Sequence, residues 1–359
     1  MTEMDATDSY NSSIPRDVYR QIDPIGFYSD FIRQYVRPNG RKLHEYRELD
    51  VVDLLGENRN FSSMPKEEGT TISSVRLAAG ETHVHCVVKA FPILCDVPAE
   101  ACPDSDSLIT VDIELSKHLQ PYVYDVNGVC ANLNYCVSAI IENVLNSSDV
   151  LSVDQLRFHQ LLDAGPQGGA NDKISEYIVK MRLTWKIEIA IHFEEYDGNL
   201  VDMAILATSF ALQKAHLPIA LLEYSNLRGS YVIRYLDEKT LEQAFNDDCK
   251  ICLEEDVCAQ QLVERFKGVD FIGVPLHVKA LPCTVTFLKF QRGTYILDPS
   301  NEEEKLGVNV SFYCLRGSDG SIRTQILNLM GCQGITADDY HCLEQVALDV
   351  IKSIANKKY

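Results

Sequence analysis

Residues 177–218 constrain the fold of this chain more than any other stretch. Up to Phe193 apolar and polar residues alternate and many are β-branched, a pattern typical of a β-strand. The turn YDGN at 196–199 follows, and the alanine-rich stretch from about Leu200 to Ala215 predicts a helix that ends before Pro218. A strand, a turn and a helix in this order favour an α+β layer.

The same order of elements is expected twice along the chain. Before this unit we predict a helix over Asp23–Tyr35, strands in SSVRLAAG, HVHCVVKAFPIL and LITVDIEL, and a packed helix over Asn134–Leu145. After it we predict strands in VPLHVKALPCTVTFLKF, GTYILDP, VNVSFYCLRG and SIRTQILNLMG, with a D-G turn at 318–321. A closing helix over Ala337–Lys357 begins at the capping residue Thr336. This pattern predicts two α+β domains of related layout.

Length and composition agree with two globular domains. The chain has 359 residues, of which 46% are apolar and 24% charged, and single cores rarely grow beyond about 250–300 residues. No apolar run approaches the roughly 18 residues that cross a bilayer, and the first residues lack the features of a signal peptide. We therefore expect a soluble intracellular protein with a polar mobile leader at 1–23, a first domain at 24–219, an acidic insertion or linker at 220–267 and a second domain at 268–359.

Charge and cysteine usage narrow the functional classes. A formal net charge of −19 argues against a chain that binds nucleic acid over a broad surface, because phosphate contacts need clustered Lys and Arg. Most of the twelve cysteines are expected to be reduced thiols that act as small buried apolar groups. The tightest group, Cys249, Cys252 and Cys258, lacks the fourth ligand of a structural zinc site, so no metal or other cofactor is expected. What the acidic residues 237–256 bind is left open.

Three motifs, in the same order and at a similar spacing, carry a resemblance to a known family. The stretch FIRQYVRPNGRKLHEYREL resembles the opening of the RNase PH family, although Asn39 stands where that family usually has Asp. YDGNLVDMAILATSFAL is similar to the family's Asp-Gly-Asn helix, and ILDPSNEEE is similar to the Asp-Pro-Thr-x-x-Glu-Glu of one branch, the non-catalytic subunits of the exosome ring. The matching residues are Arg37, Pro38, Gly40, Arg41, Glu45, Arg47, Asp197, Gly198, Asn199, Asp202, Ala204, Ala207, Ala211 and Leu212.

The resemblance covers the chain from about Pro24 to the end, apart from 220–267. It implies an α+β fold of two RNase PH-type domains, the first like domain 2 of ribosomal protein S5. It also implies a catalytically inactive structural subunit of the RNA exosome core ring, which supports 3′→5′ RNA processing and degradation, including ribosomal RNA maturation. The implied partners are other RNase PH-like subunits and RNA-binding cap subunits, with RNA reached through the complex and no membrane. The implied location is the nucleus, with the nucleolus, and the cytoplasm.

The resemblance also provides a test of whether the acidic stretch YILDPSNEEEKL is catalytic. Active members of the family carry two acids six residues apart, and here Asp298 and Glu304 hold those places. Phosphorolysis must bind inorganic phosphate and a phosphodiester, so it needs arginines or helix N-termini as well. The family supplies arginines from a loop that corresponds to residues 116–135, which here contain Lys117, His118 and Asp125 but no arginine. We therefore interpret the acids as relics: Asp298 caps a turn or accepts backbone N–H bonds, and the glutamates face water.

Arginines 37, 41 and 47 lie close together after the first predicted helix. They form either an RNA- or phosphate-contacting patch or a set of ion pairs, with Arg41 and Arg47 bound to carboxylates such as Glu45 or Glu48; the acidic background favours the ion pairs. The candidate RNA-binding residues are Arg37, Arg41 and Lys117.

Other motifs favour structural roles. His83 and His85 share one strand face without a third metal ligand, the glycines of 165–172 lack the Lys-Ser/Thr of a phosphate loop, and Trp185 is expected in the core. Two alternatives to the structural subunit stay open. One is a phosphorolytic 3′→5′ exoribonuclease whose arginines come from a partner subunit, and the other is a free-standing binding protein of the same fold.

Overall fold

The computed structural model describes most of the chain. The described residues are 15–56, 69–95, 108–119, 133–146, 149–151, 153–158, 182–218, 220–225, 230–235, 273–290, 293–317, 321–329 and 335–356. The acidic residues 237–256, the glycine-rich residues 165–172 and the cysteines 249, 252 and 258 lie outside this part of the chain.

The first half of the chain builds a mixed six-stranded sheet. Its order is β1 (Leu49–Asp53), β2 (Thr70–Ala79), β3 (Thr82–Cys95), β6 (Arg182–Glu195) and β4 (Ile109–Leu115), with β5 (Arg157–Phe158) beside β6. All neighbours are antiparallel except β4 and β6. The alternation predicted through Phe193 is confirmed in β6, where Ile187, Ile189, Ile191 and Phe193 are buried. Trp185 is 2% exposed, as expected for a core residue.

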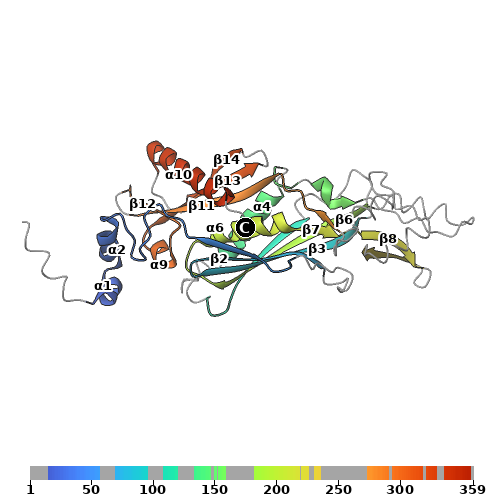
Figure 1. Ribbon diagram of the computed structural model, residues 1–359, viewed down its shortest axis with the longest axis horizontal. Helices are drawn as coiled ribbons and strands as arrows, with labels where there is room; N and C mark the ends of the chain where they lie inside the picture. The colour runs from blue at the N-terminus through green and yellow to red at the C-terminus, as the bar shows by residue number, and fades with distance from the viewer. Residues whose placement is uncertain are drawn as a thin grey trace, which may run out of the picture.

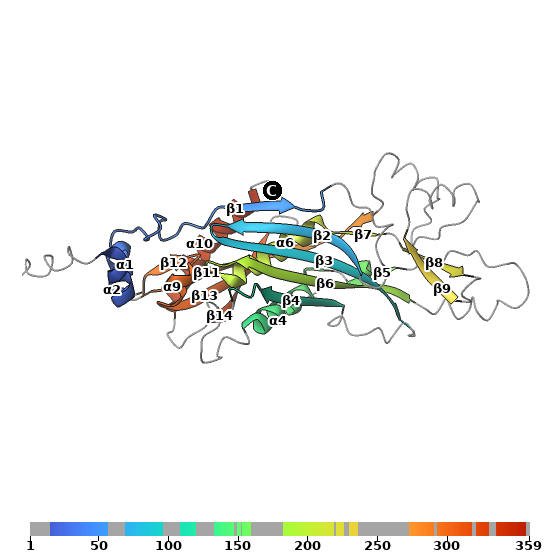
Figure 2. The same ribbon diagram turned by 90° about the horizontal axis from the view of Figure 1, so that it is seen from below.

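Two helices pack on the buried face of this sheet. Helix α6 (Leu200–Lys214) lies against β2 and β3, and α4 (Leu133–Leu145) lies against β4. Figure 2 shows the strands side by side with α6 behind them. Twelve of the fifteen residues of α6 are buried, because its other side meets the second half of the chain. The alanines of α6 leave room for this close packing on two sides.

The second half builds a four-stranded antiparallel sheet in the order β12 (Tyr295–Leu297), β11 (Ala280–Lys289), β13 (Val308–Gly317) and β14 (Ile322–Leu329). Helix α10 (Ala337–Asn356) packs on β11, and β11 also contacts α6. Buried residues of both sheets therefore form one continuous core. The cap predicted for α10 is confirmed, since the Asp339 amide donates to Thr336 Oγ1 at 3.2 Å. The observed strands and helices give a mixed α+β architecture (Figure 1).

Shorter elements complete the described part of the chain. The 3₁₀ turn η4 (Val153–Leu156) precedes β5, and α9 (Asn301–Glu304) follows β12. Strands β7 (His216–Pro218) and β10 (Gly273–Pro275) pair with each other, as do β8 (Ala220–Ser225) and β9 (Ser230–Tyr235). The last two lie inside the segment expected to be an insertion.

The N-terminal region differs from the sequence expectation. Helix α1 (Arg16–Ile22) lies within the stretch expected to be a mobile leader, and Tyr19 packs edge-on against Phe27 of α2 (Pro24–Ile32). Asp23 caps the start of α2, and its side chain accepts the Gly26 amide at 2.9 Å. Phe27, Tyr28 and Ile32 of α2 pack with Leu288 and Ile296 of the second sheet and with Phe290, which follows β11. Residues assigned to the first domain thus lie against the second half of the chain. None of the described helices is long and apolar enough to cross a membrane.

Candidate functional site

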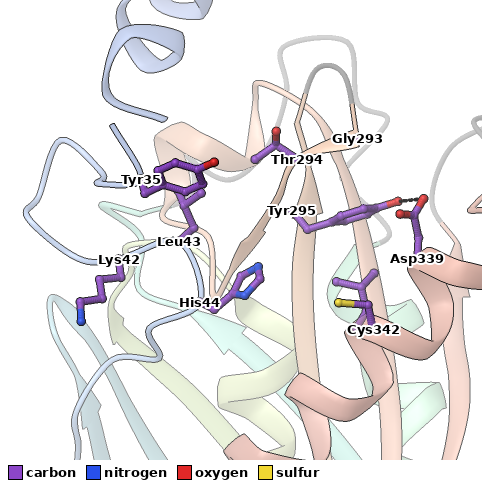
Figure 3. Close-up of a pocket in the computed structure, with 10 residues that line it drawn as sticks. Tyr35, Lys42, Leu43, His44, Gly293, Thr294, Tyr295, Asp339 and Cys342 are labelled. Atoms are coloured by element: carbon purple, nitrogen blue, oxygen red, sulfur yellow. Dashed lines mark hydrogen bonds between the residues drawn. The ribbon is translucent and has the colours of Figure 1, made fainter. Parts of the chain in front are cut away.

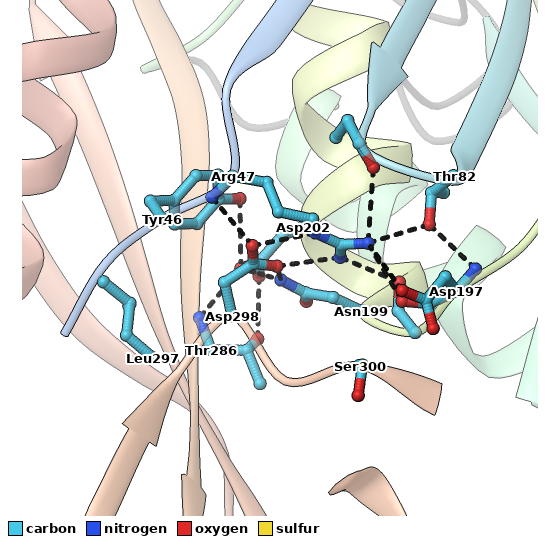
Figure 4. A network of polar contacts seen from close by, with 12 residues as sticks. Tyr46, Arg47, Thr82, Asp197, Asn199, Asp202, Thr286, Leu297, Asp298 and Ser300 are labelled. Atoms are coloured by element: carbon cyan, nitrogen blue, oxygen red, sulfur yellow. Dashed lines mark hydrogen bonds and ion pairs between the residues drawn. The ribbon is translucent and has the colours of Figure 1, made fainter. Parts of the chain in front are cut away.

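The two acid positions of the sequence motif lie at the junction of the two sheets. Asp298 follows β12 directly, is fully buried, and has the left-handed backbone conformation (φ 50°) that is uncommon outside glycine. Its own amide donates to the Thr286 carbonyl at 2.9 Å. This conformation turns the carboxylate away from the second sheet, toward Arg47 in the segment that precedes β1 (Figure 4).

Arg47 and Arg41 both bind the Asp298 carboxylate. Arg47 donates from Nε to Oδ2 at 2.9 Å and from NH2 to Oδ1 at 2.8 Å, and its amide donates to Oδ2 at 3.0 Å. Arg41 NH1 donates to Oδ2 at 2.9 Å, and Asn199 Nδ2 donates to Oδ1 at 2.7 Å. Asp298 therefore accepts five hydrogen bonds from three residues. The bond from the Arg47 amide agrees with the expectation that Asp298 caps a turn or accepts backbone N–H bonds, whereas the bonds from the two arginine side chains were not expected.

These contacts determine the protonation states of Asp298 and Arg47. Burial alone would raise the pKa of Asp298, but the charge and hydrogen bonds of Arg47, with Arg41 and Asn199, outweigh it and hold the pKa below its usual value. Burial also disfavours the charged form of Arg47, yet Asp298 raises the pKa of that guanidinium above its usual value. Both groups are charged near neutral pH. A charged carboxylate that accepts five hydrogen bonds has no proton to donate and is poorly placed to accept one.

Arg47 also connects the two halves of the chain through its hydrogen bonds. Its NH1 group donates to the Asp197 carbonyl at 2.9 Å and to Thr82 Oγ1 at 3.0 Å, and its NH2 group donates to the Gly198 carbonyl at 3.2 Å. These acceptors belong to the turns of the first sheet, whereas Asp298 belongs to the second. The expectation that Arg47 pairs with a carboxylate was right in kind, but the partner is Asp298 and not Glu45 or Glu48.

Arg37 is buried in a second ion pair, with Glu303 of α9. Its Nε donates to Glu303 Oε1 at 2.9 Å, with a further contact from NH2 to Oε2, and NH1 donates to the Leu297 carbonyl at 2.9 Å. The Arg37 side chain is 0% exposed and that of Glu303 is 1% exposed. Arg37 thus presents no surface to RNA in this fold, and the expectation that the glutamates face water was wrong for Glu303.

Glu304, the second acid position, points back to the first sheet. Its carboxylate accepts the Asn199 amide at 2.9 Å and the Tyr196 hydroxyl at 2.9 Å, with Asn309 Nδ2 at 3.4 Å. Burial raises the pKa of Glu304, and these donors only partly offset the effect. Glu304 was also expected to face water, and the structure instead uses it to hold the turn before α6.

The turn at 197–199 lets these groups converge. Gly198 has φ 84° and Asn199 has φ 63°. A Cβ at Gly198 would lie 2.5 Å from the Asn301 amide nitrogen, so the turn and α9 pack backbone to backbone. Asn199 Nδ2 donates to Asp202 at 2.9 Å as well as to Asp298, and Asp202 accepts the amide and hydroxyl of Thr286 at 2.8 and 2.7 Å.

The sequence contained a signal for part of this site that we did not use. Ser300-Asn-Glu-Glu303 has the spacing of a capping box, which predicts a short helix start with Glu303 folded back on the chain. The structure has this start, and the Ser300 amide donates to Glu303 Oε2 at 2.8 Å. Glu303 lies 266 positions after Arg37. A single sequence gives no signal for a pair so far apart.

The remaining sequence candidates lie apart from these contacts. Lys117 is exposed just after β4. His83 Nδ1 lies 3.2 Å from Glu195, and His85 Nε2 lies 2.9 Å from Ser74 Oγ. Within the described ranges no group of three His, Cys, Asp or Glu residues is arranged to hold a metal ion.

A groove with a volume of 490 Å³ lies beside this junction (Figure 3). One wall is the segment between α2 and β1, with Tyr35, Lys42 and His44. The other wall is the start of α10, where Asp339 accepts the Tyr295 hydroxyl at 3.1 Å. The lining is mainly apolar, and the groove shares no residue with the Arg47–Asp298 contacts.

Comparison with known proteins finds one matching family model and several similar folds. Residues 60–218 match the model of the 3′ exoribonuclease family, domain 1 (RNase PH). A structure described as the Archaeoglobus fulgidus exosome with RNA bound to the active site is 19% identical, with a TM-score of 0.55, over 95% of this chain and 97% of that one. An archaeal exosome core gives a TM-score of 0.54 at the same identity. The chain has an RNase PH-type α+β fold, as the sequence predicted.

Among individual proteins, the chain is similar to exosome components at low identity. Bos taurus exosome complex component RRP45 is 29% identical over 136 residues, which are 38% of this chain and 23% of that protein. Exosome complex component Rrp42 of Methanothermobacter thermautotrophicus is 24% identical over 197 residues, which are 54% of this chain and 58% of that protein. The matched segments therefore span about a quarter and somewhat over half of these relatives.

Proposed function

We propose that this chain is a structural subunit of an RNA exosome core ring and has no phosphorolytic activity of its own. Similarity to exosome components from an animal and an archaeon, and the fold shared with archaeal exosome cores, support the assignment to a ring. In this proposal the chain pairs with other RNase PH-like subunits and contacts cap subunits. It supports 3′→5′ RNA processing, including ribosomal RNA maturation, in the nucleus, the nucleolus and the cytoplasm.

The observation that carries the inactive assignment is the double ion pair at Asp298. Arg41 and Arg47 bind the carboxylate at the first acid position, and Arg37 binds Glu303. Three arginines near the expected reaction centre are therefore neutralised inside the protein. A phosphate ion and a phosphodiester would meet buried carboxylates without a free guanidinium from this group, and the loop at 116–135 contributes no arginine from its sequence.

Within the ring we propose the subunit type called ribosomal RNA-processing protein forty-three. The segment that favours this type is Phe27–Arg47, which precedes the matched range 60–218. The relatives named above are of two other types. The choice of type is tested by the neighbours of the chain in an assembled ring.

Affinity purification of the chain from native extract at moderate salt, followed by mass spectrometry, tests the proposal. We expect several RNase PH-like chains and the cap subunits in near-equal amounts. Cross-linking of the purified assembly then assigns the neighbours and so the subunit type. Recovery of the chain alone, as a monodisperse soluble monomer, would instead support a free-standing binding protein of the same fold.

The retained acids Asp298 and Glu304 favour one alternative, an exoribonuclease completed by a partner's arginines. The test is phosphate-dependent degradation of RNA by an assembly reconstituted with Glu304→Gln, with the exposed Glu48→Gln as the matched control. Equal rates for both support our proposal, whereas a selective loss with Glu304→Gln in an intact assembly would establish the enzyme. Asp298→Ala is the weaker test because it leaves Arg47 buried without its partner.

A further inference from the structure

Asp202 of α6 is a buried carboxyl group at the junction between the two halves of the chain (Figure 4). Its hydrogen bonds come from neutral groups: the Asn199 side chain, the Tyr46 hydroxyl, and the amide and hydroxyl of Thr286 on β11. A negative charge on Asp202 would therefore depend on neutral donors alone. Burying a charge without a cation in contact is costly, and a buried acid commonly keeps its proton instead.

The neighbouring acid, Asp298, binds the cations of this junction. Arg41 and Arg47 both form ion pairs with Asp298. Asn199 Nδ2 donates to Asp298 at 2.7 Å and to Asp202 at 2.9 Å, so both carboxyl groups lie against one amide nitrogen. Two carboxyl groups that share a site do not both ionise easily, because their charges repel. Since the arginines keep Asp298 charged, Asp202 is the one expected to retain a proton.

The two carboxyl oxygens of Asp202 have different surroundings. Oδ2 lies 2.8 Å from the Thr286 amide nitrogen, 2.9 Å from Asn199 Nδ2 and 3.4 Å from the Tyr46 hydroxyl, and it accepts from all three. Oδ1 lies 2.7 Å from Thr286 Oγ1, and a hydroxyl can accept as well as donate. Thr286 Oγ1 also lies 2.8 Å from Ser311 Oγ, and either hydroxyl can be the donor of that bond. A proton on Oδ1 thus finds an acceptor in Thr286, whose own hydrogen then turns to Ser311.

We propose that Asp202 carries a proton on Oδ1 at neutral pH and that this proton makes the junction between α6 and the second sheet sensitive to alkaline pH. The protonated carboxyl links α6 to β11 and β13 through the hydroxyls of Thr286 and Ser311. Loss of the proton leaves a buried charge beside Asp298 and reverses the direction of these hydrogen bonds, so the junction weakens as pH rises. The inference does not depend on the proposed ring function.

The direction of the pKa shift agrees with this geometry. Burial raises the pKa of Asp202, the charge of Asp298 adds to the effect, and the donors at Thr286 and Asn199 offset it only in part. The contribution of such a group to stability is complete below the pKa of the unfolded chain, and it is lost as pH rises through the folded pKa.

Other titratable groups face Asp202 from the elements that pack against it. They are Tyr46 before β1, Cys283 of β11, Cys314 of β13 and Asp298 after β12. Burial raises the pKa of Tyr46, and it raises the pKa of each of the two thiols to about 12. These three groups therefore stay neutral up to about pH 8. Burial also raises the pKa of Glu304, which contacts the Asn199 amide, but Glu304 is common to wild type and any variant of Asp202.

The test compares urea unfolding of wild type and Asp202→Asn between about pH 5 and pH 8. Asn is neutral, and its Nδ2 can donate to Thr286 Oγ1 as the protonated carboxyl does. We expect the variant to be at least as stable as wild type at about pH 8. Wild type releases the Asp202 proton only on unfolding, since the usual pKa is 3.8. The ratio of the unfolding constant of wild type to that of the variant should therefore rise about tenfold per pH unit until the folded carboxyl ionises.

The exposed Asp50→Asn on β1 is the matched control, and its ratio to wild type should not follow this slope. A second readout uses wild type itself, labelled with carbon-13 aspartate. Its infrared spectrum near pH 7 should contain the carbonyl stretch of a protonated aspartic acid, which alkaline pH removes. The band should persist in Asp197→Asn, which removes a half-exposed aspartate whose pKa burial also raises.

Three outcomes would overturn the proposal. The first is a ratio that does not change with pH, or that levels off below about pH 7. The second is an Asp202→Asn variant that does not fold or is much less stable than wild type at about pH 8, because the junction would then need the charged carboxylate. The third is a wild-type spectrum near pH 7 without a protonated aspartic acid.

Discussion

Arg47 and Asp298 are 251 positions apart in the chain and form a buried two-point ion pair, with Nε–Oδ2 and NH2–Oδ1 distances of 2.9 and 2.8 Å. The Arg47 side chain is 6% exposed and that of Asp298 is 0% exposed. The same guanidinium holds the turns of the first sheet at Thr82, Asp197 and Gly198. Asp298 and Arg47 thus join the two halves of the fold.

Asp298→Asn should destabilise the protein by roughly 3 kcal/mol, because it leaves the buried Arg47 charge without its counter-ion. Asn keeps the shape of the side chain and tolerates φ 50° better than most residues, so backbone strain is not a confounding cause. Urea unfolding followed by circular dichroism measures the effect. The exposed Asp50→Asn on β1 is the control and should change stability by less than about 0.5 kcal/mol. A loss as small as the control's would show that the ion pair does not hold the junction.

The stabilising effect of Asp298 should depend on pH in a defined direction. Its pKa is lower in the folded protein than its usual 3.8, so its contribution is present above the unfolded pKa and is lost as pH falls through the folded pKa. The difference in unfolding free energy between wild type and Asp298→Asn should therefore be constant near neutral pH and shrink below about pH 4. The raised pKa values of Asp202 and Glu304 affect both proteins and largely cancel in the difference.

That measurement is a series of urea titrations from about pH 6 downward on both proteins, as far as both remain folded without urea. A difference that stays constant below the usual pKa of an aspartate would mean that folding does not lower the pKa of Asp298, and would contradict the assignment. A difference that grows in acid would contradict the assigned direction.

Gly198 and Gly40 offer a matched test of close backbone packing. Both have positive φ, 84° and 87°, but a Cβ at Gly198 would lie 2.5 Å from the Asn301 amide nitrogen, whereas nothing lies within 4 Å of one at Gly40. Gly40→Ala should cost roughly 1 kcal/mol from conformation alone. Gly198→Ala should cost roughly 3 kcal/mol or more, because α9 must also move. Equal losses in urea unfolding would show that the turn at 197–199 can separate from α9.

The strands and helices were largely predictable because their signals are local. The alternation in β6, the alanine-rich α6 and the Thr336 cap of α10 each depend on residues close in sequence. Burial of Trp185 followed from the apolar character of its strand. Helix α1 was missed because its two turns bury no residue of their own, so no apolar stripe marks it.

The sequence identified residues of the candidate site but did not predict which of them contact one another. The motif placed Asp298, Glu304 and the arginines on the list of important residues, but it did not reveal that they pair with one another. Arg37 and Glu303 are 266 positions apart, and spacing in one sequence carries no information on such a pair. The glutamates were therefore expected in water, although Glu303 is buried against Arg37 and Glu304 binds the turn before α6.

The cysteines should divide by reactivity with iodoacetamide at pH 8. Burial raises the pKa of Cys86, Cys283 and Cys314 to about 12 in each case. Their thiolate fractions at pH 8 are then about one in ten thousand, and the thiolate is the reactive form. Cys136 and Cys342 are exposed free thiols. Peptide mapping should find these two alkylated within minutes and the three buried thiols alkylated at least about 100-fold more slowly.

Unfolding in denaturant separates burial from local charge as the cause of the low reactivity of the buried thiols. In concentrated urea these five of the twelve cysteines should react at similar rates, since burial and not local charge is the largest cause of the raised pKa at Cys86, Cys283 and Cys314. Asp298→Asn should speed alkylation of Cys283 on β11, because opening the junction between α6 and the second sheet admits solvent to that strand. Cys86 lies on β3 within the first sheet, and a smaller increase there would show that the junction opens before the sheet unfolds.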